Sequence, residues 1–217
     1  MKPRLTLKLL KHEAEQFSRR ESRYKEKSLY GVTDGKAVGT YFEHKFQQYL
    51  RGKYDWQNGS SAKGIDFPGL QVDMKVTSIK QPQSSCPFTS ARQKIYGLDY
   101  SLLIFVYKKT DDRASRTGNL DVKHVVFVAK DQTADFQTTS ELRRIIANSG
   151  NVDDIVAFMA DRCLPVDEVQ AQLLAEEILA NPPKIGYLTI SNALQWRLQY
   201  RRVIDKADEV EGVERIL

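Results

Sequence analysis

Three charged side chains, close together about one third of the way along the chain, are of the types that bind a divalent cation and activate water. Asp66, Asp73 and Lys75 lie in the stretch GIDFPGLQVDMK, which is otherwise mostly apolar. Carboxylate oxygens are the ligands that Mg²⁺ prefers. A neighbouring lysine can orient or help to deprotonate a water, or stabilise charge that develops on phosphorus. The stretch therefore predicts a metal-dependent hydrolytic site.

A hairpin is the element that would bring the two aspartates together. Proline followed by glycine is a turn signal, because proline fixes φ and glycine tolerates positive φ. The Pro-Gly pair predicts a tight turn at residues 67–70, with Asp66 opposite Gln71. Asp66 and Asp73 then become diagonal neighbours, with Cβ atoms roughly 7 Å apart or less, and Lys75 shares their face. The apolar face of the hairpin receives Ile65, Val72, Met74 and Val76.

Two carboxylates held this close repel each other, and a divalent cation between them removes the repulsion. A third carboxylate, Glu43, belongs to a helix predicted over about residues 36–51. Glu43 sits beside the apolar stripe of this helix and can join the site if the helix packs over it. The alternative is a solvated hairpin face on which Asp73 and Lys75 form an ordinary surface pair. The apolar stripe consists of Val38, Phe42, Phe46 and Leu50.

The rest of the chain predicts a mixed α/β core and a helical C-terminal region. Continuous apolar runs predict buried strands at residues 101–107 and 124–130, separated by a polar loop over 108–120. Short strands are expected within residues 53–61 and 181–191. Helices are expected at about residues 7–27, 90–98, 140–148, 152–161, 166–180 and 192–206, the last capped by Ser191.

The expected organisation is a core with its N-terminal helix over residues 1–135 and a helical region over residues 136–217, packed as one unit. The chain has 217 residues, of which 41% are hydrophobic and 28% charged, as in folded domains that bury a sizeable core.

The net charge is +5 and the isoelectric point about 9.1, which permits a polyanionic partner without proving one. No apolar run approaches the roughly 20 residues of a membrane span, and the N-terminus lacks a secretory apolar region. Cys86 and Cys163 show no metal or redox spacing. We expect reduced thiols in a cytoplasmic protein that uses no organic cofactor.

The order of these elements and residues resembles the PD-(D/E)XK nuclease superfamily, which includes many type II restriction endonucleases. The resembling part covers residues 36–107: a helix with Glu43, a hairpin with Asp66, the sequence Asp73-Met74-Lys75, a helix and a further strand. The family's proline before the first aspartate is replaced here by isoleucine, at a position that varies in the superfamily.

This resemblance implies a restriction-endonuclease-like mixed sheet flanked by helices. It implies that Asp66 and Asp73 ligate Mg²⁺, for which Mn²⁺ can substitute. Lys75 would assist the attacking water, and Glu43 would be an auxiliary metal or water ligand. Some members of the superfamily carry Gln-x-x-x-Tyr in the following helix, but Gln93 and its tyrosine are one residue too close for that pattern.

Polar and basic side chains that follow the hairpin could bind phosphates or base edges. For residues 80–85 the alternative is a polar surface loop. For residues 92–94 it is a solvated helix face, and for Arg197 and Arg201 it is the packing of an amphipathic helix with its arginines in solvent. Arg197 and Arg201 would lie one turn apart on that last helix, which could be the second helix of a helix-turn-helix-like pair. The groups are Lys80, Gln81, Gln83, Ser84 and Ser85; Arg92, Gln93 and Lys94; and Arg197 with Arg201.

Three functional hypotheses follow. The first is a Mg²⁺-dependent endonuclease that cleaves double-stranded DNA, most like a type II restriction endonuclease, acting as a homodimer on a palindromic site. The second is a structure-specific repair or Holliday-junction-resolving nuclease with the same chemistry. The third is a non-catalytic DNA-binding protein on the same fold, against which the intact set of acids and lysine argues.

Overall fold

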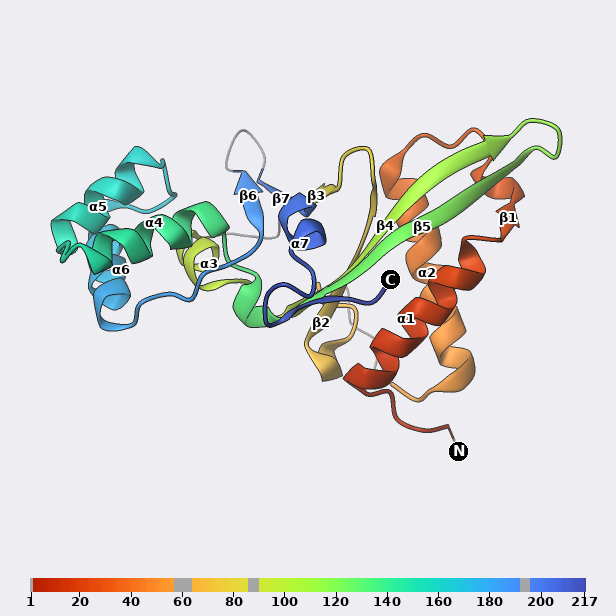
Figure 1. Cartoon of the computed structure of the whole chain (residues 1–217), viewed down its shortest axis with the longest axis horizontal. Coiled ribbons are helices and arrows are strands. Elements are labelled where there is room, and N and C mark those ends of the chain that lie inside the picture. Colours follow the sequence, from red (N-terminus) through yellow and green to blue (C-terminus); the bar gives the residue numbers. More distant parts are fainter. Residues whose placement is uncertain (1, 57–63, 86–89, 192–195) are drawn as a thin grey trace.

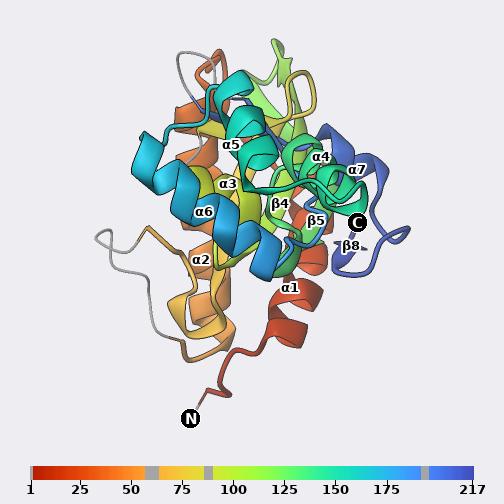
Figure 2. The same ribbon diagram turned by 90° about the vertical axis from the view of Figure 1, so that its left-hand side faces the viewer.

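A computed structural model describes residues 2–56, 64–85, 90–191 and 196–217. Its main β-sheet has α-helices on one side, and a separate helical lobe lies at the other end of the molecule (Figure 1). Seen from the end of that lobe, its helices lie in front of the main sheet (Figure 2). Within the described residues, no helix is long and apolar enough to cross a membrane.

The main sheet contains both parallel and antiparallel strands. Its order is β1-β5-β4-β2, with β8 also paired to β5. β2 is parallel to β4, and the remaining pairs are antiparallel. The predicted mixed α/β fold, a mixed sheet flanked by helices, is therefore confirmed. The strands are β1 (Lys25–Glu26), β2 (Val72–Ser78), β4 (Ser101–Asp112), β5 (Thr117–Val128) and β8 (Val213–Arg215).

β4 and β5 form one long hairpin, and the predicted polar loop over residues 108–120 is wrong. Pairing continues from Lys108↔Asp121 to Asp112↔Thr117, so the turn contains only residues 113–116. The strands resemble a loop here because most of their side chains are polar, although Leu120 still packs into the core. β1 pairs with this outer part of β5, and a 2.9 Å ion pair joins Lys25 to Asp112.

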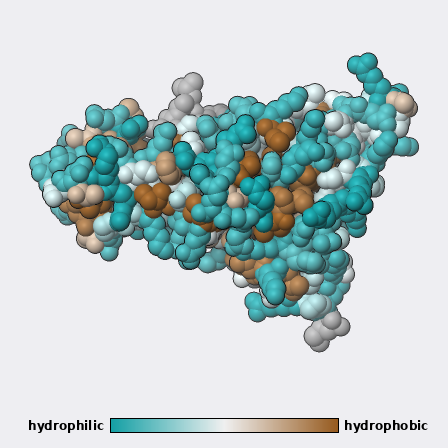
Figure 3. Space-filling view, viewed as in Figure 1, coloured by the Kyte–Doolittle hydropathy of each residue, from teal (hydrophilic) through white to brown (hydrophobic). Residues whose placement is uncertain are grey.

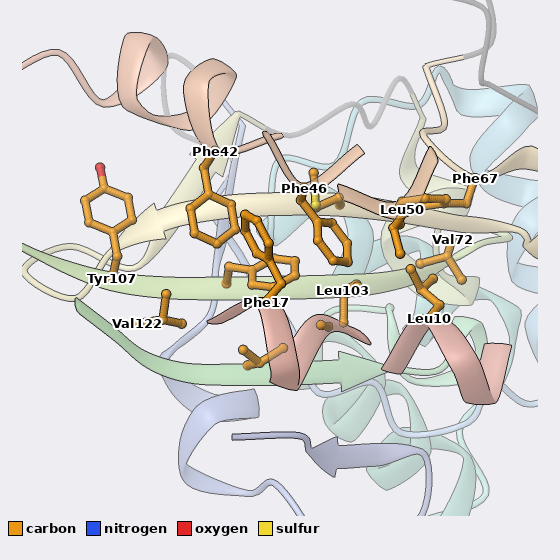
Figure 4. Packing of buried hydrophobic residues seen from close by; sticks show 14 of the residues in the cluster. Leu10, Phe17, Phe42, Phe46, Leu50, Phe67, Val72, Leu103, Tyr107 and Val122 are labelled. Atoms are coloured by element: carbon orange, nitrogen blue, oxygen red, sulfur yellow. The ribbon is translucent and has the colours of Figure 1, made fainter. Parts of the chain in front are cut away.

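Helices α1 (Leu7–Glu21) and α2 (Gly35–Lys53) pack on one face of the main sheet through aromatic side chains. Phe17 of α1 contacts Phe42 of α2 with ring centroids 5.2 Å apart (Figure 4). The predicted apolar stripe of α2 is fully buried, and Asp34 caps the helix. The predicted first helix, residues 7–27, was too long, because its last residues enter β1 and the short 3-10 helix η1 (Lys27–Leu29).

A helical lobe with its own core contains α3 (Ala91–Tyr96), α4 (Phe136–Ala147), α5 (Val152–Asp161) and α6 (Glu168–Ala180). The predicted α5 and α6 are confirmed. α4 begins four residues earlier than predicted, because the buried Asp135 carboxylate caps it by accepting hydrogen bonds from the backbone and hydroxyl of Thr138. A short 3-10 helix, η3 (Lys130–Gln132), leads from β5 towards this lobe.

A small three-stranded sheet lies between the lobe and the main sheet (Figure 1). Its strands are β3 (Gln83–Ser85), β7 (Arg197–Gln199) and β6 (Thr189–Ser191). The predicted helix over residues 192–206 is wrong. Of this range, residues 192–195 lie outside the described part, the next residues form β7, and only α7 (Arg201–Asp205) is helical. Leu198 and Tyr200 are both buried, so this segment follows the two-residue period of a strand.

The predicted short strand within residues 53–61 is not formed in its described part. Asp55 makes an isolated bridge to Arg4, and residues 57–63 lie outside the described part. The short strand predicted within residues 181–191 is confirmed as β6. The last residues of the chain return to the main sheet as β8 rather than continuing the helical region.

Candidate active site

The two aspartates meet at a hairpin whose register differs by two residues from the predicted one, since Asp66 lies opposite Asp73 and not Gln71. The pairing is Phe67↔Val72, and the 3-10 turn η2 (Pro68–Leu70) with left-handed Gln71 at φ 52° completes the loop. The Pro-Gly signal located the turn correctly but not its length. Phe67 takes a core position (1% exposed) and thereby sets the register, which brings Asp66 level with Asp73 rather than diagonal to it.

Strand β2 holds Asp73 and Lys75 on the face opposite to the aromatic core. Asp73 and Lys75 are paired with Leu102 and Ile104 of β4, whereas Met74 is paired with Leu103 and packs into the aromatic core. Because side chains alternate along a strand, the predicted separation of charged and apolar faces in β2 is correct. β2 is an edge strand of the main sheet, so its charged side chains can be reached from outside.

Asp73 is almost completely buried, with 3% of its surface exposed. The Lys75 ammonium lies 2.7 Å from its Oδ2 atom, close enough for an ion pair. The lysine does not approach Oδ2 in the direction that a hydrogen bond requires, so this buried oxygen accepts no hydrogen bond within the described structure. An oxygen in this state has a lone pair available for another ligand.

Asp66 is held in an unusual electrostatic state. The pKa of its carboxyl group is raised from 3.8 to about 7, mainly by burial and also by the negative charges of Asp73 and Glu43, against the lowering effect of the Met74 backbone N–H. That N–H donates to Asp66 Oδ2 at 2.9 Å. The raised pKa means that the Asp66 carboxyl group keeps its proton to a higher pH than an exposed aspartate does.

Gln47 is a site residue that the sequence reasoning missed. Its Nε2 atom donates to Asp66 Oδ1 at 3.2 Å. Gln47 lies four residues after Glu43 on α2, and residues at this spacing share a helix face. The four-residue spacing from Glu43 could therefore have identified Gln47 from the sequence.

Glu43 reaches the same place from α2. Burial raises the pKa of its carboxyl group, Lys75 lowers it, and Asp73 raises it. Glu43 and Lys75 line a cleft of about 570 Å³. The structure thus brings together all four residues predicted to form the reactive centre, with Glu43 and Lys75 at the open side and the two aspartates behind them.

The site fits a partly hydrated cation better than a closed metal cage. Among the described residues, no group of three or more His, Cys, Asp or Glu side chains is arranged to hold a metal ion. Mg²⁺, however, keeps several waters and is commonly bound through one or two carboxylates. The buried Oδ2 of Asp73 accepts no hydrogen bond, and the Asp66 carboxyl resists ionisation alone. Both observations fit a pair of carboxylates that a cation would stabilise.

The walls of the cleft carry several of the predicted nucleic-acid contacts. Gln83, Ser84 and Ser85 of β3 and Arg197 of β7 line it opposite α2. The N-terminal turn of α2 adds Lys36 to the lining. Four of the ten predicted contact residues therefore lie beside the reactive centre.

The remaining predicted contacts lie elsewhere. Lys80 and Gln81 are exposed where β2 ends, outside the lining of the cleft. Arg92 is exposed, as its alternative of a solvated helix face predicts, and forms a 2.8 Å surface ion pair with Glu177 that joins α3 to α6. Gln93 is half-buried on α3.

Lys94 and Arg201 are also separated from the cleft. Lys94 is buried at 4% exposure, lies 5.8 Å above the ring of Trp196, and lines a second hollow beside the lobe. Arg201 is exposed on α7, where its charge contributes to lowering the pKa of His124 on β5. Arg197 and Arg201 therefore do not share a helix face, and the predicted helix-turn-helix-like pair is wrong.

Comparison with known proteins defines the class. The family model described as "Type II restriction enzyme NspV" matches residues 4–215. The type II restriction enzyme NspV of Nostoc sp. is 61% identical over 209 residues, which cover 96% of this chain and 95% of that enzyme. No solved structure matches the chain.

These similarities cover nearly the whole chain, so the protein is a restriction endonuclease, an enzyme that cleaves DNA. It belongs to the type II restriction enzyme NspV family.

Proposed function

We propose that this enzyme cleaves double-stranded DNA in a Mg²⁺-dependent reaction at the centre formed by Asp66, Asp73, Lys75 and Glu43. The observation that carries the proposal is the pair of adjacent aspartates, of which Asp73 is buried with an oxygen that accepts no hydrogen bond, at a cleft whose walls carry Arg197 and Lys36. The element order around this pair supports a PD-(D/E)XK nuclease core. Asp73 and Lys75 lie on the edge strand β2, and Asp66 lies in the segment that precedes the turn before it.

Asp66 and Asp73 would hold the cation, and Gln47 would keep the Asp66 carboxylate oriented. Mg²⁺, when bound, polarises the scissile phosphate and makes a coordinated water more acidic. Lys75 donates hydrogen bonds from its ammonium group, so it can orient the attacking water and offset the negative charge that grows on the phosphate. Glu43 can accept a hydrogen bond from a water in the cleft, which makes it an auxiliary ligand.

We further propose that two copies of the chain act together on a palindromic site. Each chain described here contains one reactive centre, whereas a cut through both strands needs two cleavage events. A two-fold symmetric dimer presents two such centres to the two strands of a palindrome. We also expect the enzyme in the cytoplasm, where it would meet DNA.

The test is cleavage of a long mixed-sequence duplex by the purified protein, followed by sequencing of the ends. With Mg²⁺ or Mn²⁺ we expect discrete ends that share one short palindromic motif, and with EDTA we expect intact DNA. Ends without a common motif would contradict sequence specificity. Cleavage that persists in EDTA would contradict the metal-dependent mechanism.

A further inference from the structure

One face of the small sheet consists of hydrogen-bonding side chains. β7 lies in the centre, with β3 on one side and β6 on the other. Because side chains alternate between faces, residues two apart on these strands point the same way. The register aligns them in two rows, Gln83–Gln199–Thr189 and Ser85–Arg197–Ser191.

These six side chains, which we call the polar face, are all at least partly exposed. The opposite face carries the row Ser84–Leu198–Ile190, in which Leu198 and Ile190 are buried in the second core. The Ser84 hydroxyl lies 2.5 Å from that of the buried Tyr200. Ser84, which the sequence suggested as a contact residue, therefore has a structural partner, whereas its neighbours Gln83 and Ser85 belong to the polar face.

The size of the polar face matches the major groove. Adjacent strands are about 4.8 Å apart and alternate residues about 6.8 Å apart along a strand, so the two rows cover roughly 10 by 7 Å. The major groove is about 12 Å wide and admits a β-ribbon. Arginine can bind O6 and N7 of guanine through two hydrogen bonds, and glutamine can bind N6 and N7 of adenine in the same way. Arg197, Gln83 and Gln199 are of these types, and none of the six residues is acidic.

The polar face is tied to the catalytic strand. Gln83, Ser85 and Arg197 line the same cleft as Lys75. The buried hydroxyl of Thr77, two residues after Lys75 on β2, accepts a hydrogen bond from the Gln83 backbone N–H at 3.1 Å and lies 3.0 Å from the Gln83 carbonyl oxygen, to which it donates. These bonds fix the position of β3 relative to the reactive centre.

The other edge of the polar face borders the second hollow, of about 320 Å³, where Thr189 and Ser191 line the wall together with Lys94 and Arg162. The exposed Arg162 thus lies beyond β6, as Lys36 and Lys75 lie beyond β3, while the second hollow is also lined by the buried Lys94 and Asp135. A duplex whose bases faced the polar face would have basic groups near its backbone on both sides, where they can bind phosphates.

We propose that the polar face of the small sheet reads base edges in the DNA major groove, with Arg197, Gln199 and Gln83 as the specificity-determining residues. This inference rests on the proposed function, because it assumes that double-stranded DNA occupies the cleft. It assigns recognition to β-strands rather than to a helix, and it assigns to Thr189, Ser191 and Gln199 a role that the sequence alone did not indicate.

The experiment selects DNA duplexes from a randomised pool, first by binding in Ca²⁺ and separately by cleavage in Mg²⁺. The variants are Arg197→Ala and Gln199→Ala, with exposed Arg143→Ala and Gln172→Ala in the helical lobe as matched controls. We expect each polar-face variant to lose roughly 10- to 100-fold in preference at one or two defined base pairs of the site. The controls should keep the wild-type preference, and circular dichroism should show that all variants are folded.

Unchanged preferences in Arg197→Ala and Gln199→Ala would overturn the inference. So would a uniform loss across all sequences with a weaker salt dependence, which is the pattern of a phosphate contact. This failure is distinguishable from failure of the proposed function. If the wild-type protein cut at a defined motif while the variants kept that motif unchanged, only the reading surface would be wrong. If the wild-type protein did not cut in Mg²⁺ at all, the proposed function would be wrong.

Discussion

The Asp66–Asp73 pair concentrates negative charge in a place that destabilises the metal-free protein. Both carboxyl groups are largely buried, and burial raises the pKa of Asp66 to about 7. The folded protein therefore binds a proton at Asp66 between this value and the ordinary value of 3.8, where the unfolded chain has released it. The contribution of the Asp66 carboxyl group to the free energy of unfolding is fully present below about pH 4 and is lost as the pH rises through about 7.

Asp66→Asn removes the titrating group and keeps the size of the side chain. In EDTA at about pH 8 we expect this variant to be more stable than the wild type by about 1–2 kcal/mol, or a few degrees in Tm, with a smaller difference at about pH 5. Thermal melts at both pH values measure this difference. Mg²⁺ should stabilise the wild type at the higher pH but not the variant. The exposed Asp55→Asn serves as control, and equal pH profiles for wild type and Asp66→Asn would count against the buried pair.

At the scale of elements, a single threonine joins the catalytic strand to the small sheet. Thr77→Val keeps the shape of the side chain but removes the hydroxyl that bonds to the Gln83 backbone, whose N–H keeps the Gln81 carbonyl oxygen as its second acceptor at 2.9 Å. The loss of such a hydrogen bond costs about 0.5–1.5 kcal/mol in unfolding free energy. We expect urea unfolding to show this loss and single-turnover assays to show slower cleavage at an unchanged site. A variant with wild-type stability and rate would refute the coupling between β2 and β3, and Thr77→Ser should restore both.

The elements also show what the sequence can predict. The four-residue spacing of Phe42, Phe46 and Leu50 identified α2, and the alternation around Asp73 and Lys75 identified β2 with the correct faces. These patterns come from burial on one face, which leaves a clear period in the sequence.

Other features depend on competition between parts of the fold. The hairpin register was missed because Phe67 enters the core and pairs with Val72, which lengthens the turn by two residues. The segment around Arg197 was interpreted as a helix because its leucines and aromatic residues also match a helical spacing. Its strand conformation depends on pairing with β3, which is more than 100 residues away in sequence. The ion pair between Arg92 and Glu177 likewise depends on how distant helices pack.

For the molecule as a whole, the small sheet lies between the main sheet and the helical lobe (Figure 1). Its residues line the cleft of the reactive centre on one side and the second hollow on the other. The surface seen in this view is mostly hydrophilic, with scattered hydrophobic patches (Figure 3). The proposed division at residues 135 and 136 stays a prediction. The final strands do pair across it, since β7 is bonded to β3 and β8 to β5.

We expect a homodimer in solution or on DNA, because one reactive centre per chain must serve two strands. Sedimentation velocity of the protein with a short duplex that carries its site should give two chains per duplex. Plasmid cleavage under the same conditions should give linear product with little accumulation of the nicked form. One chain per duplex together with persistent nicked plasmid would show that a single chain acts alone.

The central claim is that the Asp66–Asp73 pair at the edge of the main sheet performs cleavage. The most direct test is the single-turnover cleavage rate of Asp73→Asn on DNA that carries the enzyme's site, with the exposed Asp55→Asn as matched control. We predict that Asp73→Asn loses activity by at least about 10³-fold in Mg²⁺, because it removes a metal-binding charge. It should still bind the same DNA in the absence of cleavage. Cleavage by Asp73→Asn at the wild-type rate would contradict the account.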